Sequence, residues 1–285
     1  MKRIRKRVIL LEALGVLLFI LFMLPLLLVL INSAKDAFSI TQYPLRLPED
    51  WGQLGRNIAS IWTNPNIQYS QSFFSSVLIT VLSLLFIVFL SSQAAWVLVR
   101  TKTRLSVFIF TIFVATMVIP FQIVMFPLLS WFRVVTDITG IRLLRTYAGI
   151  ILAYLGFGSS LSIFMYHGFI KSIPYELEEA ASIDGCGRIR VFYTIIHPIL
   201  RPIHATVLVL NSIWIWNDYL LPLLILGKSG RVMTIPLAVS NLAGAYVKQW
   251  DLMLTAILMS MVPVVVFFLI AQRSIIKGMV QGSIK

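Results

Sequence analysis

The stretch that decides the fold is FFSSVLITVLSLLFIVFLSSQAAWVLV, which runs from Phe73 to Val99 without a charged residue. A helix needs about 20 mostly apolar residues to cross the hydrocarbon of a bilayer, so this stretch can span it. The whole chain has the same character, since 59% of its 285 residues are hydrophobic, 12% are charged, and the mean hydropathy is +0.90. Soluble domains carry about 25% charged residues. The composition therefore excludes a water-soluble enzyme and predicts an all-α integral membrane protein.

Six apolar runs of this length follow one another along the chain. The predicted spans are Val8–Ile31, Phe73–Val99, Leu105–Trp131, Tyr147–Ile170, Ile203–Leu226 and Leu252–Ala271. The first run follows a basic stretch, as a signal sequence does, but its apolar part is too long for a cleaved signal. We therefore expect an uncleaved first span. Because no internal repeat divides the sequence, residues 1–285 are predicted to form a single transmembrane domain.

Lysine and arginine indicate the orientation, because the cytoplasmic loops of membrane proteins carry an excess of both. The formal net charge is +13. With the N-terminus inside, the inner segments hold 15 of the 24 basic residues, although the outer loops are longer. Both termini are therefore predicted to be cytoplasmic in a multi-pass plasma-membrane protein. The basic residues lie between apolar runs and do not form the clustered face that nucleic acid requires, so we expect no nucleic-acid partner.

The predicted spans hold few groups that could do chemistry. Ion-coupled carriers have ionisable residues deep in their spans, whereas Glu12, Asp218 and Asp251 lie towards span ends. The three histidines have no metal-ligand spacing, and the single cysteine, Cys186, excludes an internal disulfide. We expect neither a catalytic nor a metal site. An ion-coupled secondary transporter is the alternative function, and a membrane-embedded enzyme would need a catalytic constellation that the sequence lacks.

The cytoplasmic segment 171–202, between the fourth and fifth spans, holds four of the eleven acidic residues. Pro174 marks a helix start, and three glutamates follow in the first turn, where negative charge suits the helix dipole. The sequence Asp184-Gly185-Cys186-Gly187 then breaks the helix. A second short helix is expected from Arg188 to Ile196, with Pro198 ending it. Such a segment is either a solvated hairpin or an element that fits a groove of another protein.

The spacing within this segment resembles the EAA loop of importer permeases of the ATP-binding-cassette (ABC) superfamily. The matching positions are Glu179-Ala180-Ala181, Gly185, Ile195 and Pro198. Two positions depart from the signature, since His197 stands where leucine is usual and Cys186 where alanine is frequent. The chain is similar to the carbohydrate-uptake branch, and specifically to the shorter permease subunit of maltose-type importers, over four further stretches: Gln93–Arg100, Ile119–Pro127, Trp216–Pro222 and Gln272–Gly278.

This resemblance implies a type I importer fold with six spans and no catalysis or cofactor on this chain, because a partner ATPase binds ATP. The implied partners are a second homologous permease, two ATPase subunits and an extracytoplasmic sugar-binding protein, assembled in the bacterial plasma membrane. The implied function is sugar import, with the sugar left open. The EAA-like loop would form the coupling helix that contacts the ATPase, at Glu179, Ala180, Ala181, Asp184, Gly185 and Pro198.

A polar and aromatic stripe on the fifth span is the candidate substrate path. Asn211, Trp214 and Asp218 share one face at helical spacing, and Asn217 lies beside them. Planar polar groups next to an aromatic ring suit a sugar. The same stripe can instead hydrogen-bond to neighbouring helices, and we favour that structural role slightly.

Overall fold

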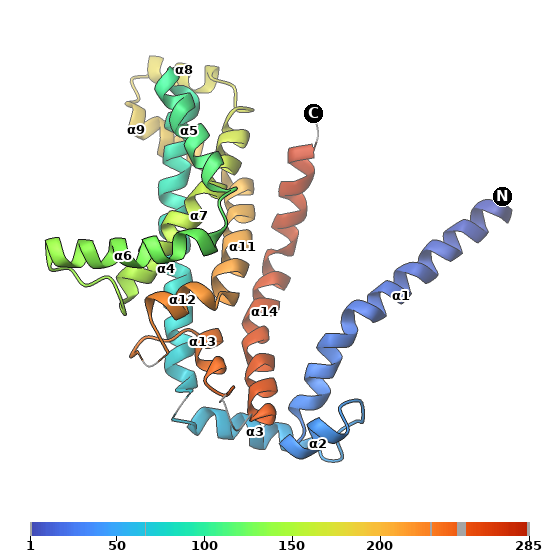
Figure 1. Ribbon diagram of the computed structural model, residues 1–285. Helices are drawn as coiled ribbons and strands as arrows, with labels where there is room; N and C mark the ends of the chain where they lie inside the picture. Colours follow the sequence, from blue (N-terminus) through green and yellow to red (C-terminus); the bar gives the residue numbers. More distant parts are fainter. Residues whose placement is uncertain (1, 66, 229, 244–248, 284–285) are drawn as a thin grey trace. The chain divides into compact units, whose positions relative to one another are not determined.

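The computed structural model describes residues 2–65, 67–228, 230–243 and 249–283. Within these ranges the chain is helical and contains no strand (Figure 1). The helices belong to two compact units, unit 1 with Met1–Ser70 and Ala238–Pro263, and unit 2 with Gln71–Leu237 and Val264–Lys285. The single transmembrane domain expected for residues 1–285 stays a prediction.

Unit 1 is built from α1 (Lys2–Ser33), α2 (Ala37–Gln42), α3 (Gly52–Thr63) and the first part of α14 (Trp250–Ser283). Hydrogen bonds to the end of α1 hold these helices together. The Asn57 side chain donates to the carbonyls of Ser33 (3.0 Å) and Lys35 (3.1 Å), and the Thr255 hydroxyl donates to the Ser33 carbonyl at 2.9 Å. The chain thus leaves its first span through a turn whose carbonyl groups are satisfied from two other helices.

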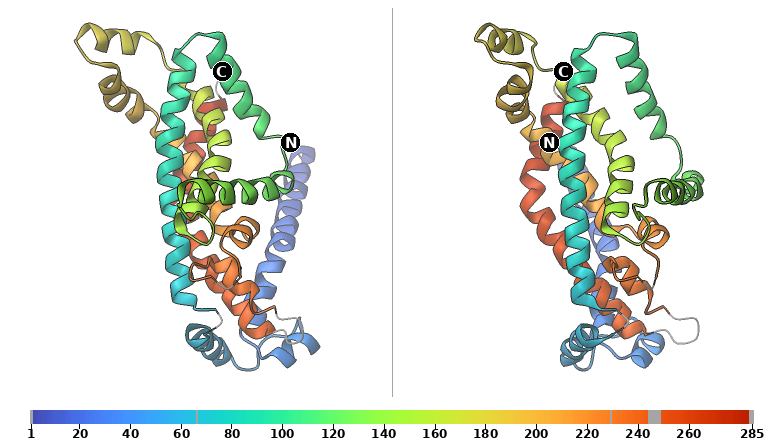
Figure 2. Two further views of the ribbon diagram at one scale, coloured as in Figure 1. Left: turned by 60° about the vertical axis from the view of Figure 1, so that its left-hand side comes forward. Right: turned by 90° about the vertical axis from the view of Figure 1, so that its left-hand side faces the viewer.

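Unit 2 has three long helices that lie side by side, α4, α7 and α11, while α6 lies crosswise to α4 (Figures 1 and 2). The Ser75 hydroxyl on α4 lies 2.8 Å from the Tyr147 hydroxyl on α7, and α7 also packs against α5 and α11. The main helices of this unit are α4 (Tyr69–Arg100), α5 (Arg104–Thr116), α6 (Phe121–Thr139), α7 (Tyr147–Ile170), α11 (Arg201–Asn217) and α12 (Leu220–Ile225); α13 (Ile235–Ser240) lies at the boundary between the units.

A glycine allows the central helices of unit 2 to approach one another closely. A Cβ atom at Gly158 on α7 would lie 2.6 Å from Ile87 Cδ1 on α4 and 2.9 Å from Asn211 Oδ1 on α11. Because lipid tails are as apolar as the helices themselves, helices in membranes associate through close packing at such small residues and through interhelical hydrogen bonds. Gly158 therefore marks the packing centre of α4, α7 and α11.

Two predicted spans differ from the helices of the structure. The run Leu105–Trp131 is two helices, because α5 ends at Thr116 and α6 begins only at Phe121, after Pro120. A proline disfavours helical backbone in the residue before it, which accounts for the break. The run Ile203–Leu226 is interrupted at Asp218, whose backbone is extended.

The remaining helices agree with the predicted membrane architecture. Among the described residues, five helices are long and apolar enough to cross a bilayer, and a bent pair, Arg188–Ile199 with Arg201–Asn217, makes a sixth candidate. The first of them, Val8–Ser33, has none of its most apolar window buried inside the chain. An apolar helix without protein cover is stable only against lipid or another subunit.

Candidate functional site

The segment between α7 and α11 forms a helical hairpin beside the end of α4 (Figures 1 and 2). We call residues 171–200 the α8–α10 hairpin. Its first arm is α8, Glu176–Ile183, with three glutamates in the first turn as predicted. Its second arm is helical from Arg188 to Ile199 and consists of α9 (Arg188–Val191), a π-helical turn (Phe192–Ile196) and α10 (His197–Ile199).

Gly185 makes the reversal between the two arms. Its φ of +81° lies in the left-handed region, which glycine adopts without the steric cost that a side chain incurs. The amide of Asp184 donates to the Ala180 carbonyl, and the amide of Cys186 donates to the Ala181 carbonyl at 2.9 Å, so the end of α8 is closed by backbone bonds. No atom of the described residues, apart from its chain neighbours, lies within 4 Å of a Cβ built at Gly185. The backbone conformation, and not crowding within this chain, therefore requires glycine.

The predicted helix end at Pro198 is corrected by the structure, because the helix continues through this proline to Ile199. Proline has no N–H, and its ring clashes with the carbonyl four residues earlier in a regular α-helix. Here the preceding turn is widened, since the amide of His197 donates to the Phe192 carbonyl five residues back. The second arm then meets α11 at a bend of 74°.

A buried ion pair fastens the hairpin to α4. Arg100 Nε donates to Glu178 Oε1 at 2.7 Å, and Trp96 Nε1 donates to Glu178 Oε2 at 3.1 Å. Arg100 Nη2 also donates to the Ile173 carbonyl, and its guanidinium lies 5.5 Å from the centre of the Tyr175 ring. Only 12% of the Arg100 side chain and 7% of the Glu178 side chain are exposed. Both carboxylate oxygens of Glu178 accept hydrogen bonds from α4, so this residue holds the hairpin in place against the end of that helix.

The residues predicted to contact an ATPase divide into two groups. Glu179, Ala180, Asp184 and Gly185 are exposed, whereas Ala181 is buried inside the chain and Pro198 is half-buried. Large apolar side chains also lie open on the hairpin, with Ile183 86% and Ile189 76% exposed. The hairpin thus has an exposed surface of acidic and apolar side chains around its turn. Its other face, which includes Glu178 and Ala181, is buried against the rest of the chain.

A cluster of aromatic side chains connects the hairpin to α7 and α11. The His197 ring lies 4.6 Å from the His204 ring, and His204 Nδ1 is 2.7 Å from the Tyr166 hydroxyl. The ring nitrogen Nε2 of His204 is buried and has no hydrogen-bond partner among the described residues. Nowhere in the described part of the chain do three His, Cys, Asp or Glu side chains gather as a metal ion would require. His197, which replaces the usual leucine of the signature, therefore packs across the bend before α11.

The candidate substrate stripe is split by the fold. Asn211 is buried, and its side-chain amide donates to Ser162 Oγ on α7 (3.1 Å) and to the Val207 carbonyl (2.9 Å). Asn217 and Trp214 are exposed, and the Tyr154 hydroxyl donates to Asp218 Oδ2 at 3.1 Å. Asn211 is thus committed to helix packing, and the accessible polar and aromatic groups lie at the end of α11.

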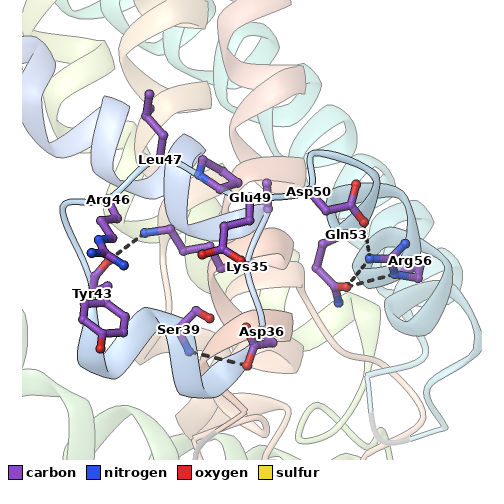
Figure 3. Close-up of a pocket in the computed structure, with 12 residues that line it drawn as sticks. Lys35, Asp36, Ser39, Tyr43, Arg46, Leu47, Glu49, Asp50, Gln53 and Arg56 are labelled. Atoms are coloured by element: carbon purple, nitrogen blue, oxygen red, sulfur yellow. Dashed lines mark hydrogen bonds and ion pairs between the residues drawn. The ribbon is translucent and has the colours of Figure 1, made fainter.

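Unit 1 contains a polar pocket of about 190 Å³, lined by residues between Ala34 and Arg56 (Figure 3). Lys35 lies at its inner side, and its ammonium donates to Asn32 Oδ1 and to the Tyr43 carbonyl, both at 2.9 Å. Burial lowers the pKa of Lys35 from its ordinary value of 10.5. At the rim, Arg56 forms an exposed ion pair with Asp50. Because the lining side chains carry both signs of charge and are largely paired among themselves, the pocket indicates an ordered loop more than a ligand site.

The joint formed by Arg100 and Glu178 was not predicted from the sequence. Arg100 was counted only as a cytoplasmic cation, and Glu178 only as an acid of the first turn. The available signal was a lone arginine at the end of an apolar run, which needs a partner when its helix end is covered. The 78 residues that separate the pair in the sequence conceal the contact.

Residues 87–281 match the family described as "Binding-protein-dependent transport system inner membrane component", and this chain belongs to that family. Its members are permease subunits of ABC importers in the bacterial plasma membrane, which work with ATPase and substrate-binding-protein partners and do not hydrolyse ATP themselves. The predicted class of protein and its non-catalytic nature are confirmed on this ground, and the ion-coupled alternative finds no support.

Relatives and a solved structure agree with this assignment. The chain is 39% identical, over all of both chains, to a permease protein of Thermoanaerobacterium thermosulfurigenes named for the transport of starch degradation products. It is 35% identical, over 80% of each chain, to a melibiose/raffinose/stachyose import permease protein of Bacillus subtilis. A chain of a bacterial ABC transporter that imports the acidic polysaccharide alginate has a similar fold, with a TM-score of 0.74 and 21% identity over 94% of this chain and 96% of that one. The predicted type I importer fold is thereby confirmed.

Proposed function

We propose that this chain is a permease subunit of an ATP-driven sugar importer and forms half of the translocation pathway. The observation that carries the proposal is the full-length similarity to a permease named for starch degradation products, together with a cytoplasmic hairpin that is rigidly joined to a span. The relatives differ in the sugars they are named for, so the proposal extends to sugars as a class.

The α8–α10 hairpin is the proposed coupling element. Its exposed residues Glu179, Ala180, Asp184 and Gly185 would enter a groove of the ATPase, with the open side chains of Ile183 and Ile189 covering the rim of the contact. Ala181 and Pro198 would not contact the ATPase directly; they would support the packing of the hairpin from its buried side. Movement of the ATPase would reach α4 through Glu178 and Arg100, and it would reach α11 across the 74° bend. Packed helices and interfaces that have two stable arrangements convert a small shift at one site into a larger movement at another.

The proposed assembly contains this chain, a second homologous permease, two ATPase subunits and an extracytoplasmic sugar-binding protein. The exposed α1 supports a neighbouring subunit or lipid on that helix, since none of its most apolar window is buried within the chain. Trp214, Asn217 and Asp218 are the residues of this chain proposed to line the sugar path, because at the end of α11 the first two are exposed and Asp218 is half-buried. Asn211 is left out of the path, since its amide is bonded to Ser162.

Reconstitution tests the function directly. The chain is co-expressed with the second permease, the ATPase and the binding protein from the same operon, and uptake of radiolabelled maltodextrins, raffinose and a monosaccharide is measured in proteoliposomes. We expect uptake that needs ATP inside and the binding protein outside. Uptake by this chain alone, driven by a proton gradient and indifferent to ATP, would overturn the proposal. A variant of the ATPase that binds but does not hydrolyse ATP is the control, and it should abolish uptake.

A further inference from the structure

A basic groove of about 550 Å³ lies where the turn after α4 meets α5 and the end of α7. Lys102, Arg104 and Lys171 line it, and none of the described lining residues is acidic. All three side chains are exposed, and none forms an ion pair with a described residue. Arg100, two residues away, is neutralised by Glu178. Lys102 comes from the segment that joins α4 to α5, Arg104 from the start of α5, and Lys171 from the end of α7. Together they give the groove a positive charge that no acidic side chain of the described residues balances.

The walls of this basic groove are apolar. Val107 and Phe110 on α5 contribute to them, and the Phe110 ring stacks on the His167 ring with centroids 3.6 Å apart. His167 is otherwise buried, and neither of its ring nitrogens has a hydrogen-bond partner among the described residues. The same helix also exposes Leu105 and Phe108, which do not line the groove. The basic groove thus adjoins an apolar surface along α5, an apolar helix of 13 residues.

We propose that the basic groove binds the phosphate headgroup of an anionic phospholipid of the cytoplasmic leaflet, with an acyl chain along α5. Lysine and arginine bind phosphate oxygens through charge-assisted hydrogen bonds, and the first turn of α5 adds the partial positive charge of a helix N-terminus. Basic pockets between membrane helices on the cytoplasmic side are typical headgroup sites. The lipid, and not an acidic segment of a partner protein, is favoured because the apolar wall follows α5 away from the hairpin that carries the proposed ATPase contact.

The site has a defined role beside the proposed coupling element. The turn after α4 and the end of α7 lead directly into Arg100 and Ile173, which are joined by a hydrogen bond of 3.1 Å. A bound headgroup would neutralise the mutual repulsion of Lys102, Arg104 and Lys171 at this place. The lipid would therefore stabilise the ends of α4 and α7, to which the hairpin is attached, without contacting the sugar path.

Titration of the assembled transporter with phosphatidylglycerol tests the site. Native mass spectrometry counts the lipid retained, and the thermal unfolding midpoint is measured in nanodiscs of phosphatidylcholine with and without phosphatidylglycerol. Each basic residue near an anionic surface contributes about a fivefold gain in binding, so Lys102→Gln with Lys171→Gln should weaken retention about 25-fold. The double variant Lys102→Arg with Lys171→Arg should retain the lipid, and Arg133→Gln with Arg142→Gln, which removes two exposed charges elsewhere, should behave as wild type.

Three outcomes would overturn the proposal. Equal retention in the Gln and wild-type proteins would show that the groove does not hold the lipid. Equal stabilisation by inorganic phosphate in pure phosphatidylcholine would identify a soluble anion as the ligand. Loss of the ATPase from the Gln variant, with lipid retention unchanged, would assign the groove to a partner protein. None of these results bears on whether sugar uptake requires ATP, so the proposed function is tested separately.

Discussion

Arg100 and Glu178 form a nearly buried ion pair, 2.7 Å between Nε and Oε1, that joins the last residue of a long membrane helix to the first turn of the cytoplasmic hairpin. A charge in such a place is stable only when paired and hydrogen-bonded. Here Trp96 and the Ile173 carbonyl complete the set of partners. The pair therefore gives the hairpin a fixed direction relative to α4, which a flexible loop would lack.

Breaking this pair is expected to destabilise the permease and to uncouple transport. Glu178→Gln leaves Arg100 buried without a charge partner, which costs about 3 kcal/mol of folding stability. The thermal unfolding of the purified transporter and the ATP hydrolysed per sugar imported are the measurements. Asp50→Asn provides the control, since it removes one partner of an exposed pair and should change neither quantity. Wild-type stability and coupling in Glu178→Gln would contradict a structural joint.

Charge reversal on the outer face of the hairpin should act without loss of stability. Glu179 is exposed and has no internal partner in the described chain, so Glu179→Lys is expected to fold normally and to lower ATPase attachment and uptake. Copurification of the ATPase with the tagged permease measures the attachment. Asp137→Lys, an exposed reversal on α6, should leave attachment intact. If the hairpin is only a solvated connection, both variants will retain the ATPase.

Substitutions of Gly185 separate backbone strain from contact with a partner. The φ of +81° makes Gly185→Val unfavourable by about 1–2 kcal/mol, whereas asparagine visits this region more easily. Gly185→Asp should abolish uptake even though the protein inserts, because it adds a charged side chain at the proposed contact. Gly187→Ala is the matched control, since Gly187 has a φ of −67° and open space around it. Normal uptake by Gly185→Asp would remove this glycine from the coupling surface.

The two parts of the polar stripe on α11 should respond to different assays. Asn211→Ala removes hydrogen bonds to Ser162 and Val207 in a packed interface, so we expect a loss of about 1 kcal/mol in stability. Asn217→Ala should leave the unfolding midpoint nearly unchanged, whereas Trp214→Ala also removes the edge-on contact with the Tyr154 ring and lowers it. Both variants should raise the sugar concentration needed for half-maximal uptake. An unaltered concentration dependence in both would exclude these residues from the sugar path.

Lys35 predicts a pH dependence of unit 1. Burial lowers its folded-state pKa below 10.5, so between the folded pKa and 10.5 the unfolded chain binds more protons than the folded chain. Stability therefore rises with pH across this window. Thermal unfolding should show wild type gaining stability relative to Lys35→Met as the pH approaches 10.5. The same pH slope in the wild type and in Lys35→Met would contradict this assignment.

Much of the architecture follows from local chemistry, because each span must satisfy its backbone internally. The run Phe73–Val99 predicts α4, and the Asp184–Gly187 sequence predicts the reversal after α8. The breaks at Pro120 and Asp218 were missed because apolar residues continue on both sides, so hydropathy does not register them. The predicted helix end at Pro198 is wrong, because a widened turn before this proline lets the helix continue.

By itself, the sequence determined the membrane class, the expected orientation, the family signature and the place of the hairpin, because apolar length, basic residues and glycine act over a few residues of chain. Only the tertiary structure decided which of two adjacent glutamates faces inward, so that Glu178 pairs with Arg100 while Glu179 is exposed. It also turned Asn211 towards Ser162 and brought Lys171 beside Lys102. These contacts depend on which helix packs against each face. Helical periodicity shows which residues share a face, but it does not show which helix packs against that face.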